Sequence, residues 1–235
     1  MPISEALAFD VYGTLVDPIG ISRRLEEYLP RTEALRVAEA WRRKQLEISF
    51  RLTAMERYED FGWCTRKALD HALALVAQEV GAGARESLIA HYNELEPYPD
   101  AAPALRTLRD RGQVLAVLSN GAPAMLDALL KATGLRPYFD EVISVEEVRA
   151  FKPSPRPYLH AAERLGRAPS EVRLVSCNSF DIIGAESAGL RAAWIDRSRG
   201  AFEPDGTPPD IVIGSLAELP GALAPWPGRP AWPAT

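Results

Sequence analysis

The chain has 235 residues, 47% hydrophobic and 25% charged, which is typical of a globular protein with enough apolar side chains for a core. Its formal net charge is −5, and no block of basic residues alternates with aromatic ones, which argues against nucleic acid as a partner. Two cysteines are too few for a disulfide framework. Without a basic leader or an apolar run of about 18 residues, we expect a cytoplasmic protein with no membrane segment.

The first predicted element is a buried strand over residues 6–9, which ends at Asp10 just before a Gly-Thr turn. Residues 18–97 then change in character: they are rich in Arg, Glu, Leu and Ala, and their apolar residues recur at helical spacing without a convincing strand. We interpret them as an inserted helical domain, so that residues 1–17 and 98–224 together form the main domain.

Strands and helices alternate through the second half of the chain. The apolar pattern predicts strands over 114–118, 141–145, 172–176, 192–195 and 211–213, and helices over 102–111, 123–133, 156–165 and 182–188. This alternation is typical of βα units and predicts an α/β fold with a parallel sheet. The proline-rich end, residues 225–235, is expected to be an irregular tail.

Polar side chains follow four of the predicted strands. In an open parallel sheet, ligands bind beyond the carboxyl ends of the strands, so these side chains are expected to converge at one edge. In chain order, the residues that reach this edge are Asp10, then Ser119 and Asn120, then Lys152, and finally Ser176, Asn178 and Asp181.

The same residues lie in four short motifs that resemble, in order, the four motifs of the haloacid dehalogenase superfamily. These are Asp10 to Thr14, Ser119-Asn120-Gly121, Phe151-Lys152-Pro153 and Ser176 to Asp181. The stretch from Trp41 to Glu47 resembles the helical cap of the L-2-haloacid dehalogenase branch. The resemblance extends from about Leu7 to Leu219 and implies a Rossmann-like core, a small helical cap domain, a cleft between them, and a homodimer.

Two positions separate the branches of this superfamily, most of whose members are magnesium-dependent phosphatases. A phosphatase needs a second Asp two residues after the nucleophile to protonate an alkoxide leaving group, whereas this chain has Tyr12. It also needs an acidic residue in the fourth motif to hold Mg²⁺, whereas this chain has Ser176 and Asn178 and keeps only Asp181. Because chloride and bromide leave without a proton, the sequence predicts a hydrolytic dehalogenase that uses no metal and no other cofactor.

The resemblance also implies a role for each site residue. Asp10 attacks the halogen-bearing carbon of a small 2-haloalkanoic acid and forms an ester, which water hydrolyses, so an (S)-2-haloacid gives the (R)-2-hydroxy acid. Lys152 keeps Asp10 ionised. The other catalytic residues are Asn178 and Asp181 for the water, Thr14 and Ser176 as hydrogen-bond supports of the carboxylates, and Arg42 as the halide receptor.

The expected substrate-binding residues are grouped by what they contact. Asn120 and Phe180 complete the halide site with Arg42, Ser119 binds the substrate carboxylate, Tyr12, Leu46 and Phe61 form an apolar wall, and Tyr158 hydrogen-bonds within the site. Other interpretations stay open: Thr14 as a helix cap, Arg42 as an exposed helix residue, and the wall residues as ordinary core.

Two other functions also stay open. The first is a phosphatase or phosphonate hydrolase of the same superfamily, which would require Mg²⁺. The second is a non-enzymatic binding protein on a decayed catalytic fold, which would be expected to have lost Asp10 or Lys152, although both are present.

Overall fold

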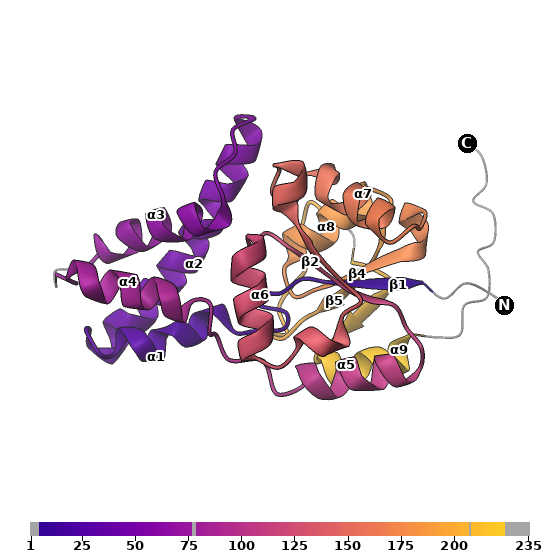
Figure 1. Cartoon of the computed structure of the whole chain (residues 1–235), viewed down its shortest axis with the longest axis horizontal. Coiled ribbons are helices and arrows are strands. Elements are labelled where there is room, and N and C mark those ends of the chain that lie inside the picture. Colours follow the sequence, from indigo (N-terminus) through magenta and orange to yellow (C-terminus); the bar gives the residue numbers. More distant parts are fainter. Residues whose placement is uncertain (1–4, 77–78, 207, 224–235) are drawn as a thin grey trace.

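A parallel sheet forms the centre of the computed structural model, which describes residues 5–76, 79–206 and 208–223 (Figure 1). Its six strands lie in the order β3-β2-β1-β4-β5-β6. The strands are short apolar runs, most of them buried on both faces, as is usual when helices cover a parallel sheet. Their bounds are β1 (Ala6–Phe9), β2 (Leu115–Ser119), β3 (Glu141–Ser144), β4 (Val172–Ser176), β5 (Arg191–Ile195) and β6 (Ile211–Ile213).

Successive residues of β1 point to opposite faces of the sheet, and each face has its own helices. Leu7 and Phe9 pack with α5 (Ala101–Asp110), α6 (Pro123–Ala132) and α9 (Leu219–Ala222), whereas Ala8 packs with α7 (Pro155–Arg164) and α8 (Ser179–Ser187). In Figure 1, α5 and α9 accordingly lie below the strands, and α7 and α8 lie above them. The α/β fold with a parallel sheet is thus confirmed.

The segment between β1 and α5 is helical and lies to one side of the sheet (Figure 1). It contains α1 (Ser22–Leu25), the long α2 (Arg31–Ala54), α3 (Phe61–Leu73) and α4 (Ala82–His91), and α2 packs along α3. Short 3₁₀ turns, among them η1 (Pro18–Ile21), link several elements. Among the residues that the structure describes, no helix is long and apolar enough to cross a bilayer.

The chain enters and leaves this helical segment along two stretches that lie side by side. Val16 and Pro97 form an antiparallel bridge, Asp17 N donates to Glu96 O at 3.1 Å, and Tyr98 N donates to Leu15 O at 2.8 Å. We call these paired stretches, residues 15–17 and 96–98, the crossing. They support the proposed division into a main domain, residues 1–17 with 98–224, and an inserted helical domain, residues 18–97. The expected irregular tail, residues 225–235, lies outside the described residues.

One helix begins earlier than its apolar pattern indicates. The predicted 182–188 is observed as Ser179–Ser187, because the first turn of α8 is polar and carries no apolar periodicity. The carbonyl of Asn178 accepts from the backbone N–H groups of Asp181 and Ile182 and so starts the helix. Asp181 therefore lies inside the first turn of α8 rather than in the loop before it.

Candidate active site

The carboxylate of Asp10 lies at the carboxyl end of β1 and is 5% exposed. Its Oδ1 accepts from Lys152 Nζ at 3.1 Å, and its Oδ2 accepts from Thr14 Oγ1 and Asn178 Nδ2, both at 2.9 Å. Gly13 makes this possible, because its φ of +98° turns the chain back so that Thr14 faces the carboxylate. Three residues from three parts of the sequence thus hold one carboxylate.

The ammonium of Lys152 is 1% exposed and uses all three of its protons. It donates to Asp10 Oδ1 at 3.1 Å, to Asp181 Oδ2 at 2.8 Å and to the carbonyl of Leu118 at 2.8 Å. Burial alone would lower the pKa of Lys152, but the two carboxylates outweigh it and raise that pKa. Lys152 therefore remains a cation.

Asp181 is completely buried on the far side of Lys152. Burial and the negative charge of Asp10 raise the pKa of Asp181, although Lys152 counteracts them. Its Oδ1 accepts from Tyr158 Oη at 2.7 Å. Burial and the neighbouring Asp181 raise the pKa of Tyr158 well above its usual value, so this phenol stays protonated and donates.

The loop between β4 and α8 is held by hydrogen bonds around Asn178. Nδ2 of Asn178 also donates to the carbonyl of Tyr12 at 3.2 Å, and its backbone N donates to Ser176 Oγ at 3.1 Å. Cys177 N donates to Thr14 Oγ1 at 3.0 Å. In this arrangement Ser176 supports the Asp10 carboxylate through Asn178, and it makes no direct hydrogen bond to a carboxylate among the described residues.

Ser119 is the last residue of β2, Asn120 follows it, and both are buried. Asn120 Oδ1 accepts from the backbone N of Lys152 at 3.0 Å, so it holds the loop that delivers the ammonium. Ser119 Oγ accepts from Gly121 N at 3.2 Å. A Cβ added at Gly121 would lie 2.9 Å from Leu126 Cδ2, so the Leu126 side chain would have to shift to admit it.

Arg42 reaches this group of residues from the helical segment. Nη2 donates to the carbonyl of Tyr12 at 3.0 Å, two residues from Asp10, and Nη1 donates to Gln45 Oε1 at 3.0 Å. The side chain is half-buried, so an exposed position on α2 is excluded. A second contact lies near the end of the same helix, where Thr53 Oγ1 accepts from Phe151 N at 3.0 Å.

Aromatic rings lie beside Arg42 and Asp10. Tyr12 packs against Phe61 with 5.7 Å between ring centroids and stacks on Tyr92 at 5.6 Å. All three rings are buried, whereas Leu46 is half-buried. The Tyr12 hydroxyl is buried and has no hydrogen-bond partner among the described residues, so its ring takes part mainly as an apolar surface.

Three residues near the site are missing from the sequence prediction. Gln45 and Tyr92 contact Arg42 or its partners, and Phe50 packs edge-on against Phe180 with 5.0 Å between centroids. Gln45 lies inside the cap-like stretch 41–47, so the sequence could have indicated it as a site residue. No sequence pattern indicates Tyr92 or Phe50, because only the packing of the helical segment brings them near the site.

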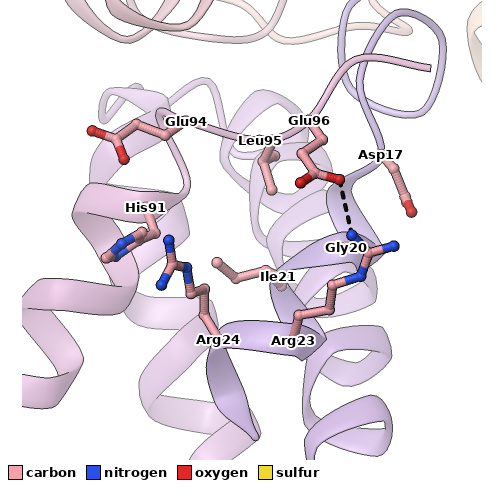
Figure 2. A pocket seen from close by; sticks show the side chains of 9 residues that line it. All are labelled: Asp17, Gly20, Ile21, Arg23, Arg24, His91, Glu94, Leu95 and Glu96. Atoms are coloured by element: carbon pink, nitrogen blue, oxygen red, sulfur yellow. Dashed lines mark hydrogen bonds and ion pairs between the residues drawn. The ribbon is translucent and has the colours of Figure 1, made fainter. Parts of the chain in front are cut away.

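A separate hollow lies where η1 and α1 meet the end of α4 (Figure 2). Its lining includes Arg23, whose Nη1 is 2.9 Å from Glu96 Oε2, as the dashed line in Figure 2 marks. Both side chains are about three-quarters exposed, at 74% and 79%. None of the predicted site residues lines this hollow, so it is distinct from the group around Asp10.

Comparisons with known proteins agree with this geometry. The model of the haloacid dehalogenase-like hydrolases matches residues 5–189. The chain is 39% identical over 221 residues to (S)-2-haloacid dehalogenase 4A of Burkholderia cepacia, covering 94% of this chain and 95% of that protein. It also resembles the structure of L-2-haloacid dehalogenase from Xanthobacter autotrophicus with chloropropionic acid covalently bound, at 36% identity and a TM-score of 0.85, covering 93% and 98%.

Proposed function

The chain belongs to the haloacid dehalogenase-like hydrolase family, and from this premise we propose that it is an (S)-2-haloacid dehalogenase, a hydrolase acting on the carbon–halogen bond of short 2-haloalkanoic acids. One observation carries the proposal. A buried carboxylate, Asp10, pairs with the ammonium of Lys152 at 3.1 Å, and the residue two positions later is Tyr12, which at its raised pKa does not act as the acid of a phosphatase.

The first half-reaction is a displacement at carbon. Oδ2 of Asp10 accepts two hydrogen bonds from neutral groups, and Oδ1 accepts one from the ammonium of Lys152. A carboxylate oxygen of Asp10 attacks C2 from the rear, the C–O bond forms, and the halide leaves with the electron pair of the C–X bond. A single rear-side displacement inverts C2, which accounts for an (R) product from an (S) substrate.

The second half-reaction breaks the ester at the aspartyl carbonyl. Water attacks Cγ of Asp10 and gives one proton to a base; the bond between Cγ and the oxygen on C2 then breaks with its electron pair on that oxygen. This oxygen takes up a proton to become the hydroxyl of the 2-hydroxy acid, the Asp10 carboxylate is regenerated, and one H⁺ is released overall. The bond between C2 and its oxygen stays intact, so the inversion is preserved. Asn178 and Asp181 are the groups proposed to orient and activate this water, because they lie on either side of Asp10 and Lys152. Thr14, Ser176 and Tyr158 keep these groups in place.

The substrate is bound by residues from both parts of the chain. Arg42 is the proposed halide receptor, because a guanidinium is always charged and only weakly hydrated. Asn120 and the positive ring edge of Phe180 would complete the halide site. Ser119 and the backbone amides near it are proposed to bind the substrate carboxylate, and the wall formed by Tyr12, Leu46 and Phe61 is proposed to limit the alkyl chain.

The proposal extends to the state of the protein in the cell. We propose a cytoplasmic homodimer that takes a small-molecule substrate and has neither nucleic acid nor membrane as a partner, and that uses no cofactor. The family resemblance supports the dimer, and the acidic balance of −5 supports the absence of nucleic acid. Light scattering on the purified chain tests the dimer.

A single turnover in ¹⁸O-labelled water tests the ester intermediate. With enzyme in excess over (S)-2-chloropropionate, the first-turnover product is expected to carry unlabelled oxygen, because its new oxygen comes from Asp10, which then takes up label. Asp10→Asn is expected to release no halide. Asp140→Asn is the matched control, because Asp140 pairs with Arg109 at the far end of β2 and β3. Label in the first-turnover product would overturn the proposal.

A further inference from the structure

A chain of buried hydrogen bonds runs through the helical segment and ends on Arg42. Gln45 lies one turn after Arg42 on α2, and its amide is completely buried. Oε1 of Gln45 accepts from Arg42 Nη1 and from Tyr92 Oη, both at 3.0 Å, and Nε2 donates to Thr65 Oγ1 at 2.7 Å. These hydrogen bonds therefore join α2, α3 and Tyr92, the residue that follows α4.

The protons available in this hydrogen-bond network allow only one orientation of the Gln45 amide. Thr65 has one hydroxyl proton, and it donates that proton to the carbonyl of Phe61 at 2.7 Å. Thr65 Oγ1 can therefore only accept from Gln45, so the NH₂ group must face Thr65 and the oxygen must face Arg42. Tyr92, whose pKa is raised by burial, keeps its proton and donates to the same oxygen.

The surroundings make this orientation costly to lose. Trp41 and Tyr12 are buried beside this hydrogen-bond network. Trp41 Nε1 donates to the carbonyl of Thr65 at 2.8 Å, which fixes the turn of α3 that contains Thr65. A buried polar group without a partner is costly, so the amide has no alternative arrangement of similar free energy.

The other arm of Arg42 is fixed at the nucleophile. Nη2 donates to the carbonyl of Tyr12, which also accepts from Asn178 Nδ2, the residue that holds Asp10. With Nη1 held by Gln45 and Nη2 by Tyr12, the plane of the guanidinium is set. We propose that Gln45, locked by Thr65 and Tyr92, is a positioning residue that aims Arg42 at the leaving halide; this rests on the proposed function.

The test compares Gln45→Met with a control on the same helix. Ser49→Ala is the matched control, because Ser49 is also buried on α2 but donates only to the carbonyl of Leu46, at 2.8 Å. Losing a hydrogen bond to a charged group lowers kcat/KM for (S)-2-chloropropionate by roughly 10- to 100-fold in Gln45→Met and weakens inhibition by bromide similarly. Ser49→Ala should change both less than about twofold.

A double-mutant cycle separates positioning from a merely structural role. If Gln45 acts through Arg42, Gln45→Met is expected to lower the residual kcat/KM of Arg42→Ala less than about twofold. An equal loss in both backgrounds, or unchanged bromide inhibition in Gln45→Met, would overturn the proposal. Tyr92→Phe keeps the ring and removes one donor to Gln45, so it should give a smaller loss in the same direction.

A binding measurement keeps this test independent of turnover. Bromide that binds the folded protein raises its Tm, and the rise should be smaller in Gln45→Met than in wild type and Ser49→Ala, at equal ionic strength. A wild type that releases no halide but is stabilised by bromide would contradict the proposed function alone. Equal stabilisation of all three proteins would contradict the role of Gln45.

Discussion

Lys152 carries a single positive charge between the carboxylates of Asp10 and Asp181 and is almost entirely enclosed by protein. Two buried carboxylates next to one ammonium leave this group of three with an excess negative charge when both acids are ionised. The raised pKa of Asp181 reflects its burial and this excess. The site is therefore held together by a cation that cannot be removed without leaving charges unpaired.

We predict that Lys152→Met abolishes halide release and lowers the free energy of unfolding by about 3–5 kcal/mol at pH 7. Removing the cation raises the pKa of Asp181 further, and a raised pKa in the folded state contributes stability at low pH that is lost as pH rises. The deficit should therefore shrink as pH falls. Urea unfolding at several pH values measures it.

A surface lysine gives the matched control for that variant. Lys131→Met removes a pair with Asp127 that is more than half exposed, at 67% and 57%, so a change below about 1 kcal/mol is expected. If Lys152→Met were as stable as Lys131→Met at neutral pH, the central role of Lys152 would be wrong.

The polar residues around Asp10 could be predicted from the sequence, but the packing of the helical segment that holds Arg42 could not. Asp10, Lys152, Asn178 and Asp181 could be brought together because parallel strands end at one edge of the sheet. Tyr92 could not, because its contact with Gln45 spans two helices whose relative packing has no local pattern in the sequence.

At the scale of elements, α2 contacts the backbone near Asp10 and Lys152 at two levels. Arg42 contacts the carbonyl of Tyr12 from one turn, and Thr53 accepts the backbone N–H of Phe151 near the end of the helix. Phe151 precedes Lys152 directly. The position of α2 is thus coupled both to Asp10 and to the loop that carries its counter-charge, Lys152.

We predict that Thr53→Val lowers the free energy of unfolding by about 1–2 kcal/mol and lowers kcat, because the buried N–H of Phe151 loses its acceptor. Valine keeps the shape of threonine, so packing changes little. Thr107→Val is the control: Thr107 lies exposed on α5 and bonds only to the carbonyl of Pro103. Equal kcat values in the two variants would show that the contact has no effect on the site.

The bounds of the elements were predictable where apolar residues repeat. The observed α5, α6 and α7 lie within one residue of their predicted ends. The start of α8 could not be predicted in this way, because Ser179 and Asp181 lie in its first turn. The helix begins there because the carbonyl of Asn178 accepts hydrogen bonds, not because apolar residues are buried.

At the scale of the whole molecule, an ion pair between Asp100 and Arg197 lies directly beside the crossing. Arg197 donates to both oxygens of Asp100, at 2.9 and 3.1 Å, and to the carbonyl of Thr14 at 3.0 Å. Burial would raise the pKa of Asp100, but Arg197, together with Ser215 Oγ and Leu216 N, holds it below its usual 3.8. These contacts tie the residues beyond β5 and β6 to Thr14 and Asp100, which flank the crossing.

We predict that Asp100→Asn lowers the Tm and flattens the loss of stability at acid pH. A lowered pKa in the folded state contributes stability above the ordinary pKa that is lost as pH falls through the folded value. Thermal unfolding between pH 3 and 7 measures both effects. An unchanged acid dependence would show that Asp100 is as easily protonated in the folded chain as in the unfolded one.

We also predict that neither added Mg²⁺ nor EDTA changes the rate of halide release. The reason lies in the residues present: Tyr12 and Asn178 stand where a phosphatase of this family offers carboxylates, and Lys152 already bridges Asp10 and Asp181. Assays with each addition at constant ionic strength measure this. Loss of activity with EDTA, restored by Mg²⁺, would favour the phosphatase or phosphonate hydrolase alternative.

The two carboxylates beside Lys152 have a consequence for the order of events in turnover. When Asp10 is esterified it becomes neutral, and the repulsion that raises the pKa of Asp181 disappears. Asp181 is therefore expected to be more fully ionised in the alkylated enzyme than in the resting one, at the moment when a water molecule must give up a proton. The first bond-forming step would thus prepare the proposed base, Asp181, for the second, and the return of charge to Asp10 would reset it.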